Sequence, residues 1–489
     1  MRALRACPGV PLALLALLAS AVAHAAPAPV PPDEGTCPTV SGAAPRADGA
    51  AARDAEPVTL REGMRLGFAD LLVLQRLVPR EIWQHRDVFF HEGMQMELGP
   101  CHRHYPVPAF FTQATRTFSR HVELDRKGNL RGYVAGLPFA PEEIDLERED
   151  AALRWAWDMQ QRYRGAGHRG SFRIVDFPNR YGGIEVFAGN FYLLPTSARA
   201  DLAERDHRLE AGERYLWVAG GRFTQPTSAR HLAWRQFRPR SSLRDPDQPD
   251  TTFVYVPSMR KSRRASTSWV DGIYVPAYSV SDSEGGGAVS FGGEMGGSIN
   301  PASGRQAATT SNAYAGFEGL VLRPNAYVWR THGSREVLAP INATRTGYPL
   351  SPDRNFGPSG LSVASDRWEI RQAVVIEGAL RRQGESLRTV TYYVDQQTQL
   401  PLYRITRTGN RRIIDIQIFV HRFSGDVHDY PDWPGGTPAF VFDPVAEVSY
   451  NAIGGGGGWR RESYDIVSTP FDPDDLPGLT SAAALERGH

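Results

Sequence analysis

WEIRQAVVIEGALRRQGESLRTVTYYVDQQTQLPLYRITRTGNRRIIDIQIFV, residues 368–420, contains four extended runs in succession. The runs are Trp368–Leu380, Leu387–Val394, Leu400–Thr406 and Arg411–Val420. They are separated only by the short breaks Arg381–Ser386, Asp395–Gln399 and Thr408–Asn410. Connections this short can join only antiparallel neighbours, so the pattern predicts a β-meander.

In these runs, both the odd-numbered and the even-numbered positions carry apolar and aromatic side chains, so both faces of the predicted sheet are apolar. An apolar face must be covered by helices, a second sheet or a ligand. Since little helix is predicted, the sequence favours a strongly curved sheet whose concave side holds an apolar molecule. A sheet filled by its own helices and loops is the alternative, and the set of side chains that faces inward is left open. The candidate ligand contacts are Trp368, Ile370, Val390, Tyr392, Val394, Ile414, Ile416 and Ile418.

Strand signals also dominate the rest of the chain. Helices are expected at Gly67–Leu77 and Glu142–Tyr163, the second beginning after a proline and ending before Gly165. A hairpin is expected where Phe118–Leu124 turns through residues 125–129 into Leu130–Val134. Further strands are expected at Phe172–Phe177, Ile184–Leu194, Arg214–Ala219, His231–Phe237 and Thr251–Val256. The fold class is therefore mainly β, with a few helices.

The first residues have the pattern of an export signal. Arg2 and Arg5 precede an apolar stretch, Val10–Val22, which is followed by an Ala-x-Ala site at residues 23–25. We expect a signal peptide at 1–25, a flexible Pro/Ala-rich arm at 26–62, a β domain at 63–470 and a tail at 471–489. Whether the β domain is one unit or two halves that meet near 238–250 is left open. The predicted location is the periplasm, with association with the outer membrane left open. In that oxidising space Cys37 and Cys101 are expected to form a disulfide.

Charge excludes one class of partner. The formal net charge is +1, so no long-range attraction to nucleic acid is expected. One basic stretch, Arg260, Lys261, Arg263 and Arg264, follows the aromatic strand 251–256. It is interpreted either as a rim that meets lipid head groups or an acidic partner, or as an edge strand protected by charge.

No reactive constellation stands out in the sequence. A polar cluster follows the last run of the meander, but its spacing matches no known metal-ligand pattern. The cluster consists of His421, Asp426, His428, Asp429 and Asp432. Neither G-x-S-x-G nor H-E-x-x-H is present. We therefore predict no catalytic residues, no metal and no cofactor. A metal-assisted or carbohydrate-active hydrolase and a structural envelope subunit remain the alternative functions.

Several segments resemble one protein family. The hairpin Tyr392–Leu402 is similar to the "tyrosine, aspartate turn, threonine, leucine-proline" hairpin of the LolA/LolB-like periplasmic proteins, and Thr251–Arg264 resembles an earlier strand of that family. Other segments resemble its long domain-of-unknown-function branch, described as outer-membrane lipoprotein-sorting-like. These segments are Val134–Phe139, Phe317–Leu320 and Asp366–Arg371.

The resemblance implies a curved antiparallel half-barrel closed by helices, with an apolar cavity for acyl chains. It implies a periplasmic carrier of a lipid, a lipoprotein acyl chain or another apolar molecule, serving a transport component of the inner or outer membrane. It implies no catalytic residues. This chain is much longer than the small carriers, and its Gly-rich stretches Glu284–Ser298 and Gly454–Gly458, expected to be surface loops, have no counterpart in them.

Overall fold

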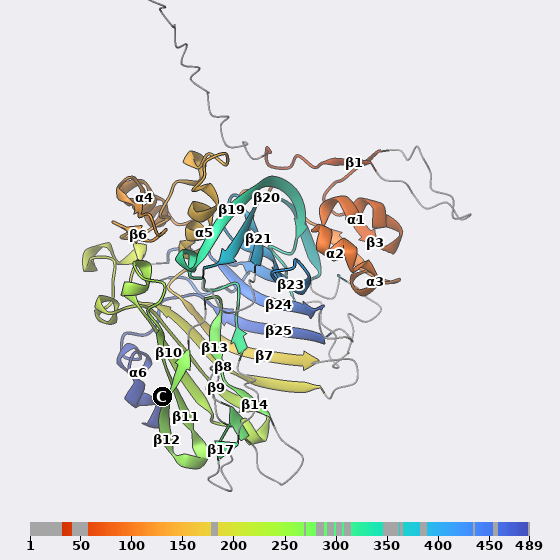
Figure 1. Ribbon diagram of the computed structural model, residues 1–489. Coiled ribbons are helices and arrows are strands. Elements are labelled where there is room, and N and C mark those ends of the chain that lie inside the picture. The colour runs from red at the N-terminus through yellow and green to blue at the C-terminus, as the bar shows by residue number, and fades with distance from the viewer. Residues whose placement is uncertain are drawn as a thin grey trace, which may run out of the picture.

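The computed structural model describes most of the chain (Figure 1). The described residues are 32–41, 57–177, 184–267, 270–279, 288–290, 298–299, 306–307, 314–345, 361, 365–381, 389–433, 436–452 and 458–487. The expected signal peptide, most of the arm and most of both Gly-rich stretches lie outside these residues.

The meander is confirmed. Its strands are β20 (Arg367–Leu380), β21 (Thr389–Asp395), β22 (Pro401–Arg407) and β23 (Ile413–Phe423). Each pairs antiparallel with the next, and the opposed residues include Ile376 with Tyr392 and Tyr403 with Ile418. The alternating apolar residues and the short turns thus specify both the strands and their order.

These strands belong to one open sheet of 15 strands. Its order is β12-β11-β10-β9-β8-β7-β25-β24-β23-β22-β21-β20-β4-β3, with β19 also paired to β20. The parallel contact in this sheet is the short one between β20 and β4, and the other pairs are antiparallel. Figure 1 shows the sheet bending from β12 through β7 to β20, so the mainly β class and the curved antiparallel sheet are confirmed.

Two meanders make up the sheet. The first is β7 (His168–Phe177), β8 (Glu185–Pro195), β9 (Tyr215–Gln225), β10 (Ala233–Pro239), β11 (Asp250–Val256) and β12 (Lys261–Thr267). The second adds β24 (Phe442–Asn451) and β25 (Gly458–Val467) to β20–β23, and β25 pairs with β7 to join the two. Residues 240–249 connect β10 with its neighbour β11 inside this sheet.

The remaining strands are short or lie at one end. β19 (Tyr327–Ala339), β4 (Gln95–Leu98) and β3 (Arg65–Gly67) complete the large sheet. Small sheets are formed by β1 (Thr39–Ser41) with β2 (Pro57–Thr59), β5 (Glu123–Leu124) with β6 (Leu130–Arg131), β13 (Ile273–Val275) with β18 (Tyr314–Gly316), and β14 to β17 (Ala277–Ser279, Ala288–Ser290, Ser298–Ile299, Gln306–Ala307).

Six α-helices lie in the described residues: α1 (Leu71–Leu77), α2 (Arg80–Gln84), α3 (Arg86–Phe89), α4 (Ala109–Phe118), α5 (Ala151–Gln161) and α6 (Leu476–Leu479). Both predicted helices are present in shortened form, as α1 and α5. The strand expected at 118–124 is wrong over most of its length, because Phe118 ends α4 and residues 119–121 form a 3-10 turn. Among the described helices, none combines the length and apolar content needed to cross a bilayer.

Helices cover the two faces of the sheet separately. One core cluster contains buried residues of α1–α3 with Tyr403, Ile416 and Ile418 of the meander, and we call this side the α1 face. A second core cluster contains α5 with Val390, Tyr392 and strand β7, and we call this side the α5 face. Side chains on both faces of the meander are buried for this reason.

Candidate functional site

The eight candidate ligand contacts do not share one surface. Trp368, Ile370, Ile416 and Ile418 lie in the cluster of the α1 face, whereas Val390, Tyr392 and Val394 lie in that of the α5 face. Ile414 is half-buried near the start of β23. Seven of these eight side chains are therefore part of the protein's own core, and a ligand could reach them only if a covering element moved.

On the α5 face, the meander carries a buried polar network. The Tyr392 hydroxyl donates a hydrogen bond to Asp271, and Arg404 lies between two carboxylates. Its Nε is 3.1 Å from Asp271 Oδ2 and its Nη1 is 2.6 Å from Glu318 Oε2. Burial, partly offset by Arg404, raises the pKa of Glu318. Because buried charges are stable only when paired and hydrogen-bonded, this network holds Asp271 and the turn that contains Glu318 against the sheet.

Little space remains at this network. The cavity that borders Tyr392, Met159 and Leu322 measures about 10 Å³, which is room for roughly one water molecule. In the part of the chain that the structure describes, helix α5 and residues 317–322 thus cover this side of the meander, whereas the sequence left open which side faces an apolar hollow. This arrangement corresponds to the alternative of a sheet filled by its own elements.

The basic stretch lies at the end of the sheet. Lys261, Arg263 and Arg264 are exposed on β12, the terminal strand, and Arg260 is exposed just before it. The backbone N–H of Ser262 donates to Glu486 Oε1 of the C-terminal 3-10 segment Ala482–Arg487 at 2.9 Å. The C-terminus therefore covers part of this edge, while the four charges stay exposed at the terminal strand of the sheet.

The polar cluster after the meander is dispersed in space. His421 is buried in β23, where burial, followed by the charge of Arg162, lowers its pKa to about 3. Asp426 accepts two hydrogen bonds from Arg103, at 2.5 and 2.7 Å, while the exposed His428 contacts its exposed neighbour Asp429. Within the described residues, no three His, Cys, Asp or Glu side chains are close enough to hold a metal ion.

The structure places Cys37 and Cys101 in a disulfide. The bridge ties the segment before β1 to the turn after β4, where Gly35 N also donates to Cys101 O at 2.9 Å. The Nε2 atom of the neighbouring His102 lies 2.9 Å from Glu336 Oε1, which links this turn to strand β19. This N-terminal segment is thus anchored beside the α1 face.

A hydroxyl, an imidazole and a carboxylate meet in the core, an arrangement the sequence did not reveal. Ser468 Oγ lies 2.6 Å from His168 Nδ1 and donates a hydrogen bond to Asp443. All three side chains are at most 1 % exposed. A nucleophilic serine needs an adjacent base that accepts its proton, and access to substrate. Here the Ser468 hydroxyl donates its hydrogen bond to the carboxylate of Asp443 instead, and the surrounding core leaves no access for a substrate. The group therefore joins the end of β25 to β7 and β24.

This group predicts a pH-dependent stability. Burial, partly offset by Ser468, raises the pKa of Asp443 to about 7 from an ordinary value near 4. The folded protein therefore retains this proton to higher pH than the unfolded chain, and the contribution of Asp443 to stability falls as the pH rises from about 4 to about 7. Relative to the isosteric variant Asp443→Asn, the wild type should lose on the order of a few kcal/mol across that range.

Urea denaturation of both proteins at pH 5 and pH 8 measures this difference. The comparison cancels the opposite effect of His168, whose pKa is lowered by burial and by Arg164 and Arg162 and which is present in both proteins. A difference in unfolding free energy that is the same at the two pH values would show that Asp443 is ionised throughout.

The structure also contains an open cleft of about 570 Å³ at the end of β20, next to residues 244–249 and 323–326. Its wall includes the apolar side chains Val270, Ala326 and Leu380. Its polar lining includes Lys127, Arg244 and Arg381, which are exposed. A volume of this size is typical of small-molecule sites. The cleft therefore offers both apolar contact and positive charge to a ligand.

Comparison with known families assigns the chain to one of them. The family described as Protein of unknown function (DUF1329) matches residues 87–282 and 299–405, which is more than half of the chain. The chain belongs to this family. The matched residues of this DUF1329 protein run from α3 to β22 and include α5 and the first meander, whereas β23, β24 and β25 follow the matched region.

Solved structures similar to this DUF1329 protein share little sequence with it. An outer membrane lipoprotein-sorting protein domain from Vibrio parahaemolyticus has 11% identity and a TM-score of 0.37, covering 70% of this chain and 100% of its own. A DUF1329 family protein from Desulfovibrio piger has 11% identity and a TM-score of 0.39, covering 69% and 98%. A LolA superfamily protein from Nitrosomonas europaea has 12% identity and a TM-score of 0.31, covering 67% and 96%. None of the curated proteins matches the chain.

Motifs that suggested the family relationship meet in this DUF1329 protein. Arg371 forms a bidentate ion pair with Asp395 of the hairpin motif, at 2.8 and 3.1 Å. Although burial alone would raise it, the Arg371 guanidinium holds the pKa of Asp395 below its ordinary value. Phe317 stacks on Phe191 of β8, with ring centroids 3.9 Å apart. These motif residues thus stabilise the sheet, and none of them lines the cleft.

Proposed function

We propose that this protein is an exported carrier in the cell envelope that binds an amphipathic molecule, with an apolar chain and an anionic group, in the cleft at the end of β20. The observation that carries the proposal is the lining of this cleft, which combines apolar side chains with the exposed charges of Lys127, Arg244 and Arg381. An anionic lipid has this chemistry, and a lipoprotein acyl chain would supply the apolar part of it.

The energetics favour such a ligand over a purely polar one. Each buried methylene contributes about 0.8 kcal/mol, so an acyl chain against Val270 and Leu380 needs few specific polar contacts. Nearby cations then select an acidic head group and orient it at the rim. Asp245 and Asp247 also line the cleft, so the excess of positive charge is moderate.

The location of the protein belongs to the same proposal. The signal-peptide pattern at residues 1–25 is typical of export, and the disulfide between Cys37 and Cys101 fits an oxidising compartment. A periplasmic carrier of an amphipathic ligand would deliver it to a transport component of the inner or outer membrane.

Ligand binding can be tested with saturated fatty acids of increasing length, displacing a fluorescent fatty acid from the purified protein. Affinity should rise by up to roughly tenfold for every two added methylenes. The double variant Lys127→Glu/Arg244→Glu should bind at least about tenfold more weakly, because both charges at the rim are reversed. Organic extraction followed by mass spectrometry would reveal any lipid that co-purifies.

The matched control is Arg263→Glu/Arg264→Glu, which reverses two exposed charges on β12, outside the cleft lining. This variant should bind fatty acid as the wild type does. The carrier proposal fails if the wild type takes up no fatty acid and carries no lipid. The cleft is the wrong site if the double variant at residues 127 and 244 binds as tightly as the control.

A further inference from the structure

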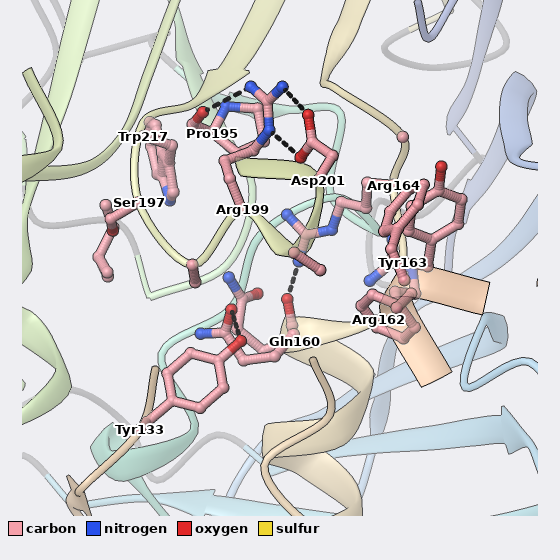
Figure 2. Close-up of a pocket in the computed structure, with 17 residues that line it drawn as sticks. Tyr133, Gln160, Arg162, Tyr163, Arg164, Pro195, Ser197, Arg199, Asp201 and Trp217 are labelled. Atoms are coloured by element: carbon pink, nitrogen blue, oxygen red, sulfur yellow. Dashed lines mark hydrogen bonds and ion pairs between the residues drawn. The ribbon is translucent and has the colours of Figure 1, made fainter. Parts of the chain in front are cut away.

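A second, smaller cavity lies between the end of α5, the loop after β8 and strand β9 (Figure 2). Its volume is about 60 Å³. Residues that line it include Tyr133, Tyr163, Arg164, Ser197, Arg199 and Trp217. Glycine at position 165 allows the chain to turn here, because its φ is +60° and a Cβ would lie 2.4 Å from the carbonyl oxygen of Ser468. The cavity is lined by none of the residues that line the cleft at β20.

Three polar groups around this cavity have no hydrogen-bond partner in the described structure. They are the Ser197 hydroxyl, the Trp217 indole N–H and the Nε–H of Arg164. Ser197 is 6 % exposed and Trp217 is 3 % exposed, so bulk water does not satisfy them. Buried polar groups are almost always hydrogen-bonded in native proteins, so three together point to a molecule that accepts their hydrogen bonds.

Positive charge is also in excess at this place. Arg162 donates to the carbonyl oxygens of Met159 and Gly319, and Arg164 donates to that of Gln160. Neither guanidinium forms an ion pair with a carboxylate of the described residues, whereas Arg199 is paired with Asp201 at 2.6 Å. Burial lowers the pKa of Arg164 to about 10, and burial and the charge of Arg164 lower that of Arg162. A buried cation without a counter-charge is unfavourable, so the cavity attracts an anion.

We propose that this cavity binds a small oxyanion, a carboxylate or phosphate group, held by Arg164, Ser197 and Trp217. The volume of about 60 Å³ corresponds to a few water molecules or one such group. Aromatic rings of Tyr163 and Trp217 exclude water around it, which strengthens hydrogen bonds to a charged acceptor. Three residues separate Arg164 from His168, and the backbone N–H of Ala166 donates to the carbonyl oxygen of Ser468 at 3.3 Å, so the site lies close to the Ser468 group. The proposal does not depend on the function assigned to the cleft.

Isothermal titration calorimetry of the full-length protein with sodium phosphate and sodium acetate, at constant ionic strength, tests this site. The wild type should bind one anion per chain. Trp217→Phe keeps the ring and removes the N–H, and Ser197→Ala removes the hydroxyl. Each variant should bind roughly tenfold more weakly, the expected effect of losing one hydrogen bond to a charged group.

The control is Arg412→Gln, which removes an exposed guanidinium in the turn before β23 and should leave the affinity unchanged. Lys127→Glu/Arg244→Glu should also bind phosphate normally, which separates this site from the cleft. The proposal is overturned if neither anion binds the wild type, or if Trp217→Phe and Ser197→Ala bind as the control does. Octanoate binding more tightly than acetate would assign the site to the head group of an acyl chain, and equal binding would assign it to a free anion.

Discussion

Replacing Trp368 by alanine is expected to lower the free energy of unfolding by about 3–5 kcal/mol, the range observed when a large buried aromatic side chain is removed. Trp368 is fully buried at the start of β20, and its carbonyl oxygen accepts a hydrogen bond from Gly99 N at 2.7 Å. The side chain therefore belongs to the core between the sheet and α1–α3, and its removal leaves a cavity. Urea denaturation followed by circular dichroism measures the change.

The control for this substitution is Phe68→Ala, since Phe68 is 39 % exposed and should cost less than about 1 kcal/mol. The same experiment separates two roles of Trp368. A residue whose main task is to contact a ligand in an open hollow would contribute little to the stability of the ligand-free protein. If Trp368→Ala lowers the free energy of unfolding by less than about 1 kcal/mol, Trp368 is not part of a packed core, and the prediction of an open apolar hollow is favoured instead.

The substitution Asp250→Asn should have an effect of similar size. Asp250 is fully buried and its carboxylate lies 2.9 Å from Arg238 Nη2 and 2.6 Å from Arg323 Nη2. The substitution removes the negative charge of the carboxylate that both buried guanidinium groups contact. Breaking a buried ion pair on one side typically destabilises a protein by about 3–5 kcal/mol.

Asp432→Asn is the matched control, because Asp432 is an exposed carboxylate and its neutralisation should change stability by less than about 0.5 kcal/mol. Thermal unfolding of the two variants and the wild type provides the comparison. Equal melting temperatures for Asp250→Asn and Asp432→Asn would show that the charges of Arg238 and Arg323 are balanced by other groups. Arg323 also lines the cleft, so fatty-acid binding should be measured only where the Asp250 variant is folded.

Local pattern was sufficient to predict the strands of the meander. Their alternating side chains and short turns act between neighbours in sequence, and β20 and β23 begin within two residues of the predicted runs. Helix α4 was missed because its sequence, AFFTQATRTF, is rich in aromatic and β-branched residues, which have low helix propensity. It is stabilised instead by tertiary contacts: a Cβ at Gly136 would lie 2.4 Å from Thr115 N, so the chain packs closely on this helix.

The candidate site could not be located from the sequence for a different reason. The sequence of a strand shows that a side chain is apolar, but it does not show whether a helix, a loop or a ligand covers that side chain. The elements that cover the meander, α1–α3 and α5, lie more than 200 residues before it in the chain. The polar groups of the small cavity come likewise from separate segments, and no short motif contains Arg164, Ser197 and Trp217 together.

The pairing of β7 with β25 has a consequence for how the chain reaches its native state. Ser463 lies opposite Arg173, 290 residues earlier in the sequence. During synthesis β7 to β12 can assemble hairpin by hairpin, whereas one edge of β7 stays unpaired until β25, the last of the described strands, has been synthesised. Contacts between such distant residues form slowly, and an unpaired edge strand recruits other chains. The pairing of β25 with β7 therefore limits the rate of folding. The nascent protein is most exposed to aggregation before this pair forms.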